Sequence, residues 1–382
     1  MILNPGPEYA WEQRRLNEFV NYTSSSLTIG DAQINGDYNL YDANSVIGKV
    51  SKGQMGENYI TIIKDGAGVG RIRMLPKNTA FIGTMGAISS NKSNLFFIYA
   101  LLTSKDLSEQ FTGSTIPHIY FKDYGNENYY IPYMKEQEKI GLYFNELDNL
   151  ITLHQREYDK TVNLKKAMLE KMFPKNGEDR PEIRFKGFTD AWEQRKLKDL
   201  CDLFTDGDWI EAKDQSDLGI RLIQTGNIGV TEFIDKNDNA KWISKETFDK
   251  LHCEKVFPGD ILISRLPEPA GRACVVPTMG TEMITAVDCT IVRTAHDCSN
   301  IFLIQFLSTQ GYFNDVNAAL AGGTRQRISR SNLASFSVLT PSLNEQEAIG
   351  TFLNYFDNLI TLHQRELIIE IQLFNLVLIM TS

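Results

Sequence analysis

The chain has 382 residues, of which 42% are hydrophobic and 23% charged, and its formal net charge is −9 at pH 7. This length leaves room for two domains, and the hydrophobic share is that of an ordinary globular protein. We expect no membrane span and no signal peptide, because no run approaches the roughly 18 apolar residues that a span needs, and the acidic balance argues against a basic protein that coats nucleic acid.

A first globule is predicted over residues 1–134. Residues 59–64 and 69–74 have strand character with a turn at Asp65 and Gly66 between them, so they predict a hairpin. A further strand is expected within 78–88, a helix at 95–104 and a loop at 113–122. The glycines of GAGVG at 66–70 resemble part of a nucleotide-binding loop, but no helix and no downstream acid follow, so a turn is the better interpretation.

A long helix is predicted over residues 135–173, with apolar or semi-apolar residues spaced alternately three and four apart. That spacing is typical of a coiled-coil seam, and 39 residues of helix at ~1.5 Å each would make a spacer of roughly 58 Å. A second such helix is predicted over 344–382. The seam residues that we expect to pack the two helices together are Ile140, Phe144, Leu147, Ile151 and His154 in the first, and Ile349, Leu353, Phe356, Ile360 and His363 in the second.

His154 and His363 could instead be metal ligands. No cysteine or carboxylate recurs beside them at ligand spacing, so helix packing is favoured and no metal site is expected.

The two long helices are parts of an internal repeat. DNLITLHQRE occurs twice without a mismatch, at 148–157 and 357–366, and upstream Pro132 pairs with Pro341 at the same spacing of 209 residues. Further upstream AWEQRRL at 10–16 returns as AWEQRKL at 191–197, but at a spacing of 181, so the second copy is 28 residues longer inside. The repeat therefore predicts one scaffold that presents two different surfaces.

A linker and a second globule are predicted over residues 174–343. Strands are expected at 260–266 and 284–293 and a helix at 300–320. Its five cysteines show no paired motif and are interpreted as free thiols of a reducing cytosol.

The stretch AGGTRQRISRSNL at 321–333 is the leading candidate for nucleic-acid binding. Its guanidinium groups are forked donors that suit phosphate or a guanine edge. The residues predicted to contact DNA there are Arg325, Gln326, Arg327, Ser329, Arg330 and Asn332, and the matching positions of the first globule hold Ser114, Thr115, His118, Tyr120 and Lys122. The alternative is a solvated turn whose arginines pair with acidic neighbours. The acidic run at 199–217 is expected to lie on a face away from DNA.

These features together resemble the specificity subunit of type I restriction-modification systems, over nearly the whole chain. The resemblance rests on the WEQRKL starts, on TRQRISRSNL, on P-x-x-x-E-Q-E at 132–138 and 341–347, and on the repeated long helices. It implies an α+β fold in which two α/β target-recognition domains are separated by two long antiparallel helices, a coiled-coil spacer with pseudo-two-fold symmetry.

The resemblance also implies a function. Each target-recognition domain would read one part of an asymmetric bipartite target in double-stranded DNA, and the helices would dock two methyltransferase subunits, which restriction subunits join. The chain itself would be non-catalytic, within a complex that is an adenine-specific DNA methyltransferase and an ATP-dependent endonuclease. S-adenosylmethionine, ATP and magnesium would belong to the partners, and the complex would act on DNA in the bacterial cytoplasm.

Two rival interpretations are open. No N/D-P-P-Y/F methyltransferase motif and no Gly-Lys-Ser/Thr phosphate loop occurs, so an enzyme would have to use a short, scattered nuclease signature. A coiled-coil scaffold that joins proteins without DNA specificity would leave the two globules and the arginine-rich loop unexplained.

Overall fold

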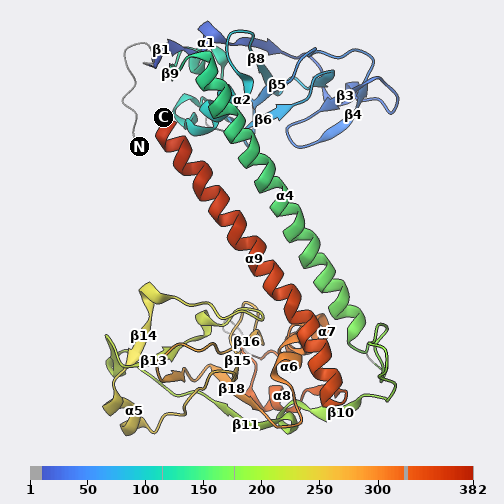
Figure 1. Ribbon diagram of the computed structural model, residues 1–382, viewed down its shortest axis with the longest axis vertical. Helices are drawn as coiled ribbons and strands as arrows, with labels where there is room; N and C mark the ends of the chain where they lie inside the picture. Colours follow the sequence, from blue (N-terminus) through green and yellow to red (C-terminus); the bar gives the residue numbers. More distant parts are fainter. Residues whose placement is uncertain (1–10, 114, 176, 322–325, 382) are drawn as a thin grey trace. The chain divides into compact units, whose positions relative to one another are not determined.

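The computed structural model describes residues 11–113, 115–175, 177–321 and 326–381, with side chains through Leu376. The chain divides into two compact units, and each contains one of the two globules (Figure 1). Unit 1 comprises residues 1–155 and 365–382, and unit 2 comprises residues 156–364. Each unit thus holds one globule, the first half of the long helix that follows it, and the last half of the other long helix.

Unit 1 is built from two small sheets and a two-stranded ribbon. The larger sheet has the order β2-β8-β5-β6, the smaller β4-β3-β7, and the ribbon pairs β1 with β9. The strands are β1 Glu12–Arg15, β2 Asn21–Ser24, β3 Tyr38–Tyr41, β4 Val46–Val50, β5 Tyr59–Ile63, β6 Ile72–Leu75, β7 Thr79–Phe81, β8 Met85–Ser89 and β9 Asn128–Ile131. The helices are α1 Leu16–Phe19, α2 Leu95–Ser104, α3 Phe121–Tyr124 and the long α4 Met134–Met172.

Unit 2 repeats this plan with insertions. The sheet β11-β18-β15-β16 matches the larger sheet of unit 1, β12-β14-β13-β17 matches the smaller one, and β10 pairs with β19. The strands are β10 Glu193–Lys196, β11 Cys201–Asp206, β12 Gln215–Ser216, β13 Ile220–Ile223, β14 Lys241–Ile243, β15 Ile261–Ser264, β16 Ala273–Val275, β17 Met283–Thr285, β18 Cys289–Thr294 and β19 Ser337–Thr340. The helices are α5 Lys245–Leu251, α6 Asn300–Phe306, α7 Gln310–Ala318, α8 Arg330–Ser335 and the long α9 Leu343–Thr381.

The repeated sequence motifs mark the same structural positions in both units. The two WEQR segments lie at the ribbon strands β1 and β10, which pair antiparallel with β9 and β19 just before the long helices begin. The smaller sheets also agree in detail, because β3 runs parallel to β7 and β13 runs parallel to β17. The α+β fold with two repeated domains is therefore confirmed, and the additional β12 and α5 account for part of the longer second copy.

Several predicted elements are interrupted in the structure. The helix expected at 300–320 is two helices, because a turn follows α6 and the Thr309 hydroxyl caps α7 by accepting from the Tyr312 amide at 3.2 Å. The strand expected at 284–293 is divided into β17 and β18 by a turn, and that expected within 78–88 into β7 and β8. The glycines of GAGVG do form a turn, since Gly66, Gly68 and Gly70 have φ of 89°, 91° and 82°.

A shared polar contact joins each long helix to its own globule. The Gln137 side chain donates to the Pro132 carbonyl at 2.8 Å and accepts from the amide of Asn94, the residue that caps α2. Gln346 repeats both contacts, with the Pro341 carbonyl at 2.9 Å and the Ser299 amide at 2.9 Å. The counterpart of Asn94 is thus Ser299.

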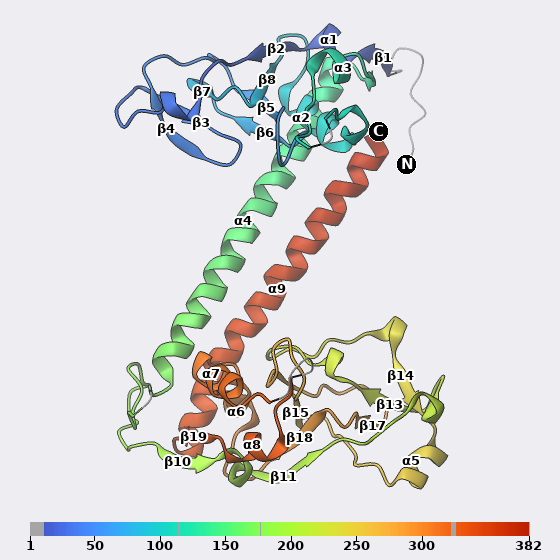
Figure 2. The ribbon, with the colours of Figure 1, turned by 180° about the vertical axis from the view of Figure 1, so that it is seen from behind.

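A glycine next to this contact lets each long helix lie close to the short helix of its own globule, α2 or α6. A Cβ on Gly141 would lie 2.8 Å from the Phe97 amide nitrogen, and one on Gly350 would lie 2.8 Å from both the Ile301 carbonyl carbon and the Phe302 amide nitrogen. Figure 2 shows α6 beside the first turns of α9. Because backbone atoms cannot move aside as a side chain can, only glycine fits at these two positions.

The two long helices run antiparallel in both units. In unit 1 the Phe144 and Phe374 rings are 5.0 Å apart and His154 Nδ1 lies 3.0 Å from a Glu370 carboxylate oxygen. In unit 2 Gln364 lies 3.3 Å from the Tyr158 hydroxyl, and Lys165 pairs with Asp357. Within each unit the α9 residue number falls as the α4 number rises, as antiparallel packing requires.

Replacing Gly350 by Ala should destabilise unit 2, because the new methyl group overlaps backbone atoms of α6. Overpacking costs about 1–3 kcal/mol, which exceeds the gain of up to ~1 kcal/mol from alanine's higher helix propensity. The matched control is Gly311→Ala in α7, where an added Cβ meets nothing within 4 Å and the same propensity should stabilise. Chemical denaturation of both variants tests this, and a Gly350→Ala chain as stable as the parent would contradict the close approach.

Candidate nucleic-acid interface

The arginine-rich loop of unit 2 is fixed to the larger sheet through its backbone. Ala321 and Arg327 form an antiparallel bridge, and the Ile328 amide donates to the Arg265 carbonyl, just after β15, at 3.0 Å. The Ile328 side chain is fully buried. The residues before and after Ile328 are therefore held at the edge of the sheet while their side chains reach outward.

The same frame recurs in unit 1, where its loop residues lie 209 positions before those of unit 2. Thr112 and His118 form the matching bridge, and the Ile119 amide donates to the Lys64 carbonyl, just after β5, at 2.9 Å. His118 therefore occupies in unit 1 the position that Arg327 occupies in unit 2. The two frames agree in backbone hydrogen bonding and differ in the side chains that they carry.

The predicted DNA-contacting residues of unit 2 fall into two groups. Gln326, Arg327 and Arg330 are exposed. Ser329 and Asn332 hold the loop itself, since Ser329 Oγ caps α8 by accepting from the Asn332 amide at 3.0 Å and the Asn332 side chain donates to the Ala319 carbonyl at 3.2 Å. Arg325 lies outside the described residues.

In unit 1 four of the five predicted residues are described, and Ser114 lies outside the described residues. Thr115 is exposed, His118 and Tyr120 stack with ring centroids 6.4 Å apart, and Lys122 Nζ lies 5.4 Å from the Tyr120 ring centroid. His118 Nδ1 is 2.7 Å from Asp65 Oδ1 in the β5–β6 turn. An aromatic and cationic group thus gathers where the turn meets the loop.

Three residues of the unit 2 cluster were missed by the sequence analysis: Asp206, Arg265 and Asp288. Asp206 ends β11, Arg265 follows β15, and Asp288 precedes β18, so three adjacent strands bring them together. Arg265 is 4% exposed, and burial lowers the pKa of its guanidinium while Asp206 opposes that shift. Only the pairing of the strands, which sequence spacing does not reveal, could have identified this group.

The acidic run was expected away from the basic loop, and this expectation is wrong for Asp206. One of its carboxylate oxygens lies 3.3 Å from Arg265 Nη2 and 3.9 Å from Arg330 Nη1. Asp288 lies 3.6 Å from Arg327 Nη2. The arginines thus have acidic neighbours, as the solvated-turn alternative requires, but both remain about half exposed.

The predicted helix-packing residues are all buried or half-buried. Phe144, Leu147, Ile349, Leu353 and Phe356 are buried, and Ile140, Ile151, His154, Ile360 and His363 are half-buried. Ile349 and Leu353 share a cluster with Met172 of α4 and with Phe302 of α6, so they pack on their own globule as well. His154 interacts with a carboxylate.

The duplicated aspartate of DNLITLHQRE has different surroundings in the two units. Asp357 accepts from Lys165 at 2.5 Å and from the Gln305 side chain at 2.8 Å. Asp148, its counterpart, has no ion pair among the residues that the structure describes, and the position equivalent to Lys165 is Phe374. Burial raises the pKa of Asp148.

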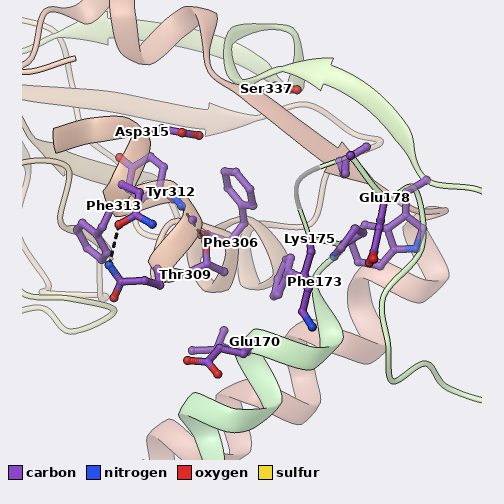
Figure 3. Close-up of a pocket in the computed structure, with 18 of the residues that line it drawn as sticks. Glu170, Phe173, Lys175, Glu178, Phe306, Thr309, Tyr312, Phe313, Asp315 and Ser337 are labelled. Atoms are coloured by element: carbon purple, nitrogen blue, oxygen red, sulfur yellow. Dashed lines mark hydrogen bonds between the residues drawn. The ribbon is translucent and has the colours of Figure 1, made fainter. Parts of the chain in front are cut away.

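A hollow of unit 2 lies at the end of α4. It encloses about 1580 Å³ between that helix end, the segment that follows, α7 and β19. Figure 3 shows Phe173 and Phe306 along it, with Glu170, Lys175 and Glu178 on the α4 side. None of its described lining residues belongs to the loop at 321–333, so it is separate from the candidate DNA-binding cluster.

No group of three or more His, Cys, Asp or Glu side chains within the described part of the chain could hold a metal ion. Nor does any helix there have the length and apolar content for a membrane crossing.

All five cysteines are free, and burial raises the pKa of Cys274 and Cys289 to about 12.

Comparison with known proteins identifies the family. The type I restriction modification DNA specificity domain matches residues 8–162 and again residues 189–373. The chain belongs to this family. It is a specificity subunit of a type I restriction-modification system, and this role implies recognition of a DNA target.

Similar proteins agree with this assignment. The type I restriction enzyme MjaVIII specificity subunit of Methanocaldococcus jannaschii is 22% identical over 385 residues, covering 93% of this chain and 88% of that protein. The crystal structure of an S subunit from M. genitalium matches with a TM-score of 0.70 at 15% identity, covering 98% of this chain and 97% of that one. A structure concerning complex assembly and conformational transition of the type I R-M system matches with a TM-score of 0.50 at 17% identity, covering 98% and 97%.

The two duplicated aspartates should respond oppositely to neutralisation. Because burial makes folded Asp148 hold its proton more tightly than the unfolded chain does, its charge destabilises the fold at pH values above the raised pKa, and this cost disappears as pH falls through that pKa. Asp148→Asn should therefore stabilise the chain at pH 7 and lose that effect in acid. Asp357→Asn should destabilise at pH 7 by roughly 1–3 kcal/mol, because Lys165 loses its charged partner.

Unfolding followed from pH 4 to pH 8 measures both substitutions. Equal effects of the two at pH 7 would contradict the difference in their surroundings.

Proposed function

We propose that this specificity subunit recognises an asymmetric, bipartite double-stranded DNA target, with one half-site for each target-recognition domain. The observation that carries the proposal is the shared loop frame, which places His118 in one unit and Arg327 in the other at equivalent backbone positions. Identical frames with different side chains are what two unlike half-sites require. The division into domains at 1–134 and 174–343, with spacer helices at 135–173 and 344–382, is part of this proposal.

The side chains proposed to contact DNA are those that the frames leave exposed or, for His118, partly exposed. In unit 2 they are Gln326, Arg327 and Arg330, with Arg325 adjacent in sequence; in unit 1 they are Thr115, His118, Tyr120 and Lys122. Arginine suits phosphate oxygens and guanine O6 and N7, and exposed aromatic and hydroxyl groups add further contacts. Ser329 and Asn332 act through the loop that they hold.

The long helices are proposed to dock the methyltransferase subunits, which restriction subunits join. Large apolar side chains are exposed on both helices, far more than a solvated face needs. In unit 1 they include Leu150, Leu153, Ile368, Ile369, Leu373 and Leu376, and in unit 2 Leu164, Tyr355 and Leu362. Adenine methylation with S-adenosylmethionine and cleavage with ATP and magnesium would be chemistry of those partners.

A scaffold that joins proteins without reading DNA is the second candidate, favoured by the same exposed apolar helix faces. Such a scaffold would not explain why the two loops share their backbone hydrogen bonds but carry different side chains.

The test is the methylated motif selected by the chain together with its methyltransferase subunits. If the arginine contacts a base, Arg327→Ala and Arg330→Ala should each reduce discrimination at one position of the second half-site by about 1–3 kcal/mol. If it contacts phosphate, each should instead lower the slope of log affinity against log salt concentration by about one. The first half-site should not change. Arg180→Ala serves as the control, because Arg180 is an exposed arginine of the segment after α4.

The purified chain alone should transfer no methyl groups. A scaffold would select no motif, and all three arginine variants would then behave like the parent.

A further inference from the structure

The carboxylates beside the loop arginines are placed to orient them without occupying their donors. Arg327 Nη2 lies 3.6 Å from Asp288, and Arg330 Nη1 lies 3.9 Å from Asp206. Both separations exceed a hydrogen bond, so the attraction is electrostatic. The Arg330 guanidinium makes one long hydrogen bond, to Thr205 Oγ1 at 3.4 Å, and that of Arg327 makes none with the described residues.

We propose that Asp288 and Asp206 are specificity-determining positioning residues that hold Arg327 and Arg330 to donate to guanine edges in the second half-site. This inference rests on the proposed function and goes beyond it, because it chooses base edges over phosphate and assigns roles to two carboxylates.

The Asp206 carboxylate is itself held by buried residues of neighbouring strands. Its Oδ1 accepts from the Thr290 hydroxyl at 2.9 Å, and its Oδ2 faces Arg265. Arg265 is in turn fixed by donating to the Val287 carbonyl at 2.6 Å. Since Thr290 is fully buried, this support is part of the sheet and does not move with the loop.

The balance of charge favours a base edge over the backbone. The two exposed arginines lie beside two carboxylates, and with the buried Arg265 the described cluster has three positive and two negative groups, a net charge of only +1. A phosphate placed on it would be repelled by the same carboxylates that hold the arginines. The guanine edge is uncharged and offers two acceptors, O6 and N7, to the fork of one guanidinium.

Unit 1 shows the same construction with different residues. His118, at the position of Arg327, has its Nδ1 held by Asp65 at 2.7 Å, so its ring orientation is fixed by a carboxylate from the neighbouring turn. Both units therefore have a carboxylate behind the outward donor, although it comes from different turns, Asp65 from the turn after β5 and Asp288 from the turn before β18.

The experiment uses the full chain with its methyltransferase subunits and measures binding to the methylated target, to single-base variants of it and to unrelated DNA at several salt concentrations. Asp288→Asn and Asp206→Asn should each reduce discrimination at one G·C pair of the second half-site by roughly tenfold. The first half-site, the affinity for unrelated DNA and the salt slope should stay as in the parent. Asp217→Asn makes the same charge change at an exposed carboxylate just after β12 and serves as a control.

Asp288→Glu and Asp206→Glu keep the charge and alter only the geometry, so they should reduce discrimination at the same base pairs. Retained recognition of the first half-site reports that each variant is folded.

The opposite outcome has a distinct signature. If the arginines contact phosphate, removing a carboxylate should strengthen binding to all DNA and steepen the salt dependence, while the Glu variants behave like the parent. That result, or unchanged discrimination in all four variants, would overturn the inference and leave the proposed function intact. A parent complex that selects no sequence would refute the proposed function, and the inference with it.

Discussion

The close contact between each long helix and the short helix of its own globule is the constraint on which the rest of the structure depends. A buried glutamine joins the proline before the long helix to the cap of α2 or α6, and a glycine one turn later lets the backbones approach. Both contacts occur in both units at equivalent positions. They fix the direction in which each long helix leaves its globule, so the short helix and the start of the long helix pack as one piece.

Outside this contact between the short and long helices, the two copies differ in their side chains. The loop frames keep their backbone hydrogen bonds but carry His118 in one unit and Arg327 in the other. The helix seam also differs between the copies, because Asp357 pairs with Lys165, whereas the position equivalent to Lys165 in the other copy holds Phe374. The residues that dock each long helix are therefore the same in both copies, whereas residues of the loops and of the helix seam differ.

Much of this could be predicted from the sequence, because an exact repeat reveals a duplicated structure without any knowledge of its fold. The long helices follow from their spacing of three and four, and the helix at 95–104 is confirmed with those bounds. The division of 300–320 into two helices was missed because the cap at Thr309 is a local hydroxyl contact within a continuous apolar pattern. The cluster of Asp206, Arg265 and Asp288 was missed for a different reason, since it depends on which strands pair and their spacing is irregular.

The repeated long helices are proposed to set the distance between the half-sites, and changing their length tests this most directly. One heptad inserted after Glu157 and another after Glu366 keep the seam in register and lengthen both helices by about 10 Å. At about 3.4 Å for each base pair, the methylated motif selected with the methyltransferase subunits should gain roughly three base pairs of unread gap. Both half-site sequences should be retained, with lower affinity because the added pairs turn one half-site relative to the other. Methylation at the original gap would contradict the account, because the helices would then not determine the spacing.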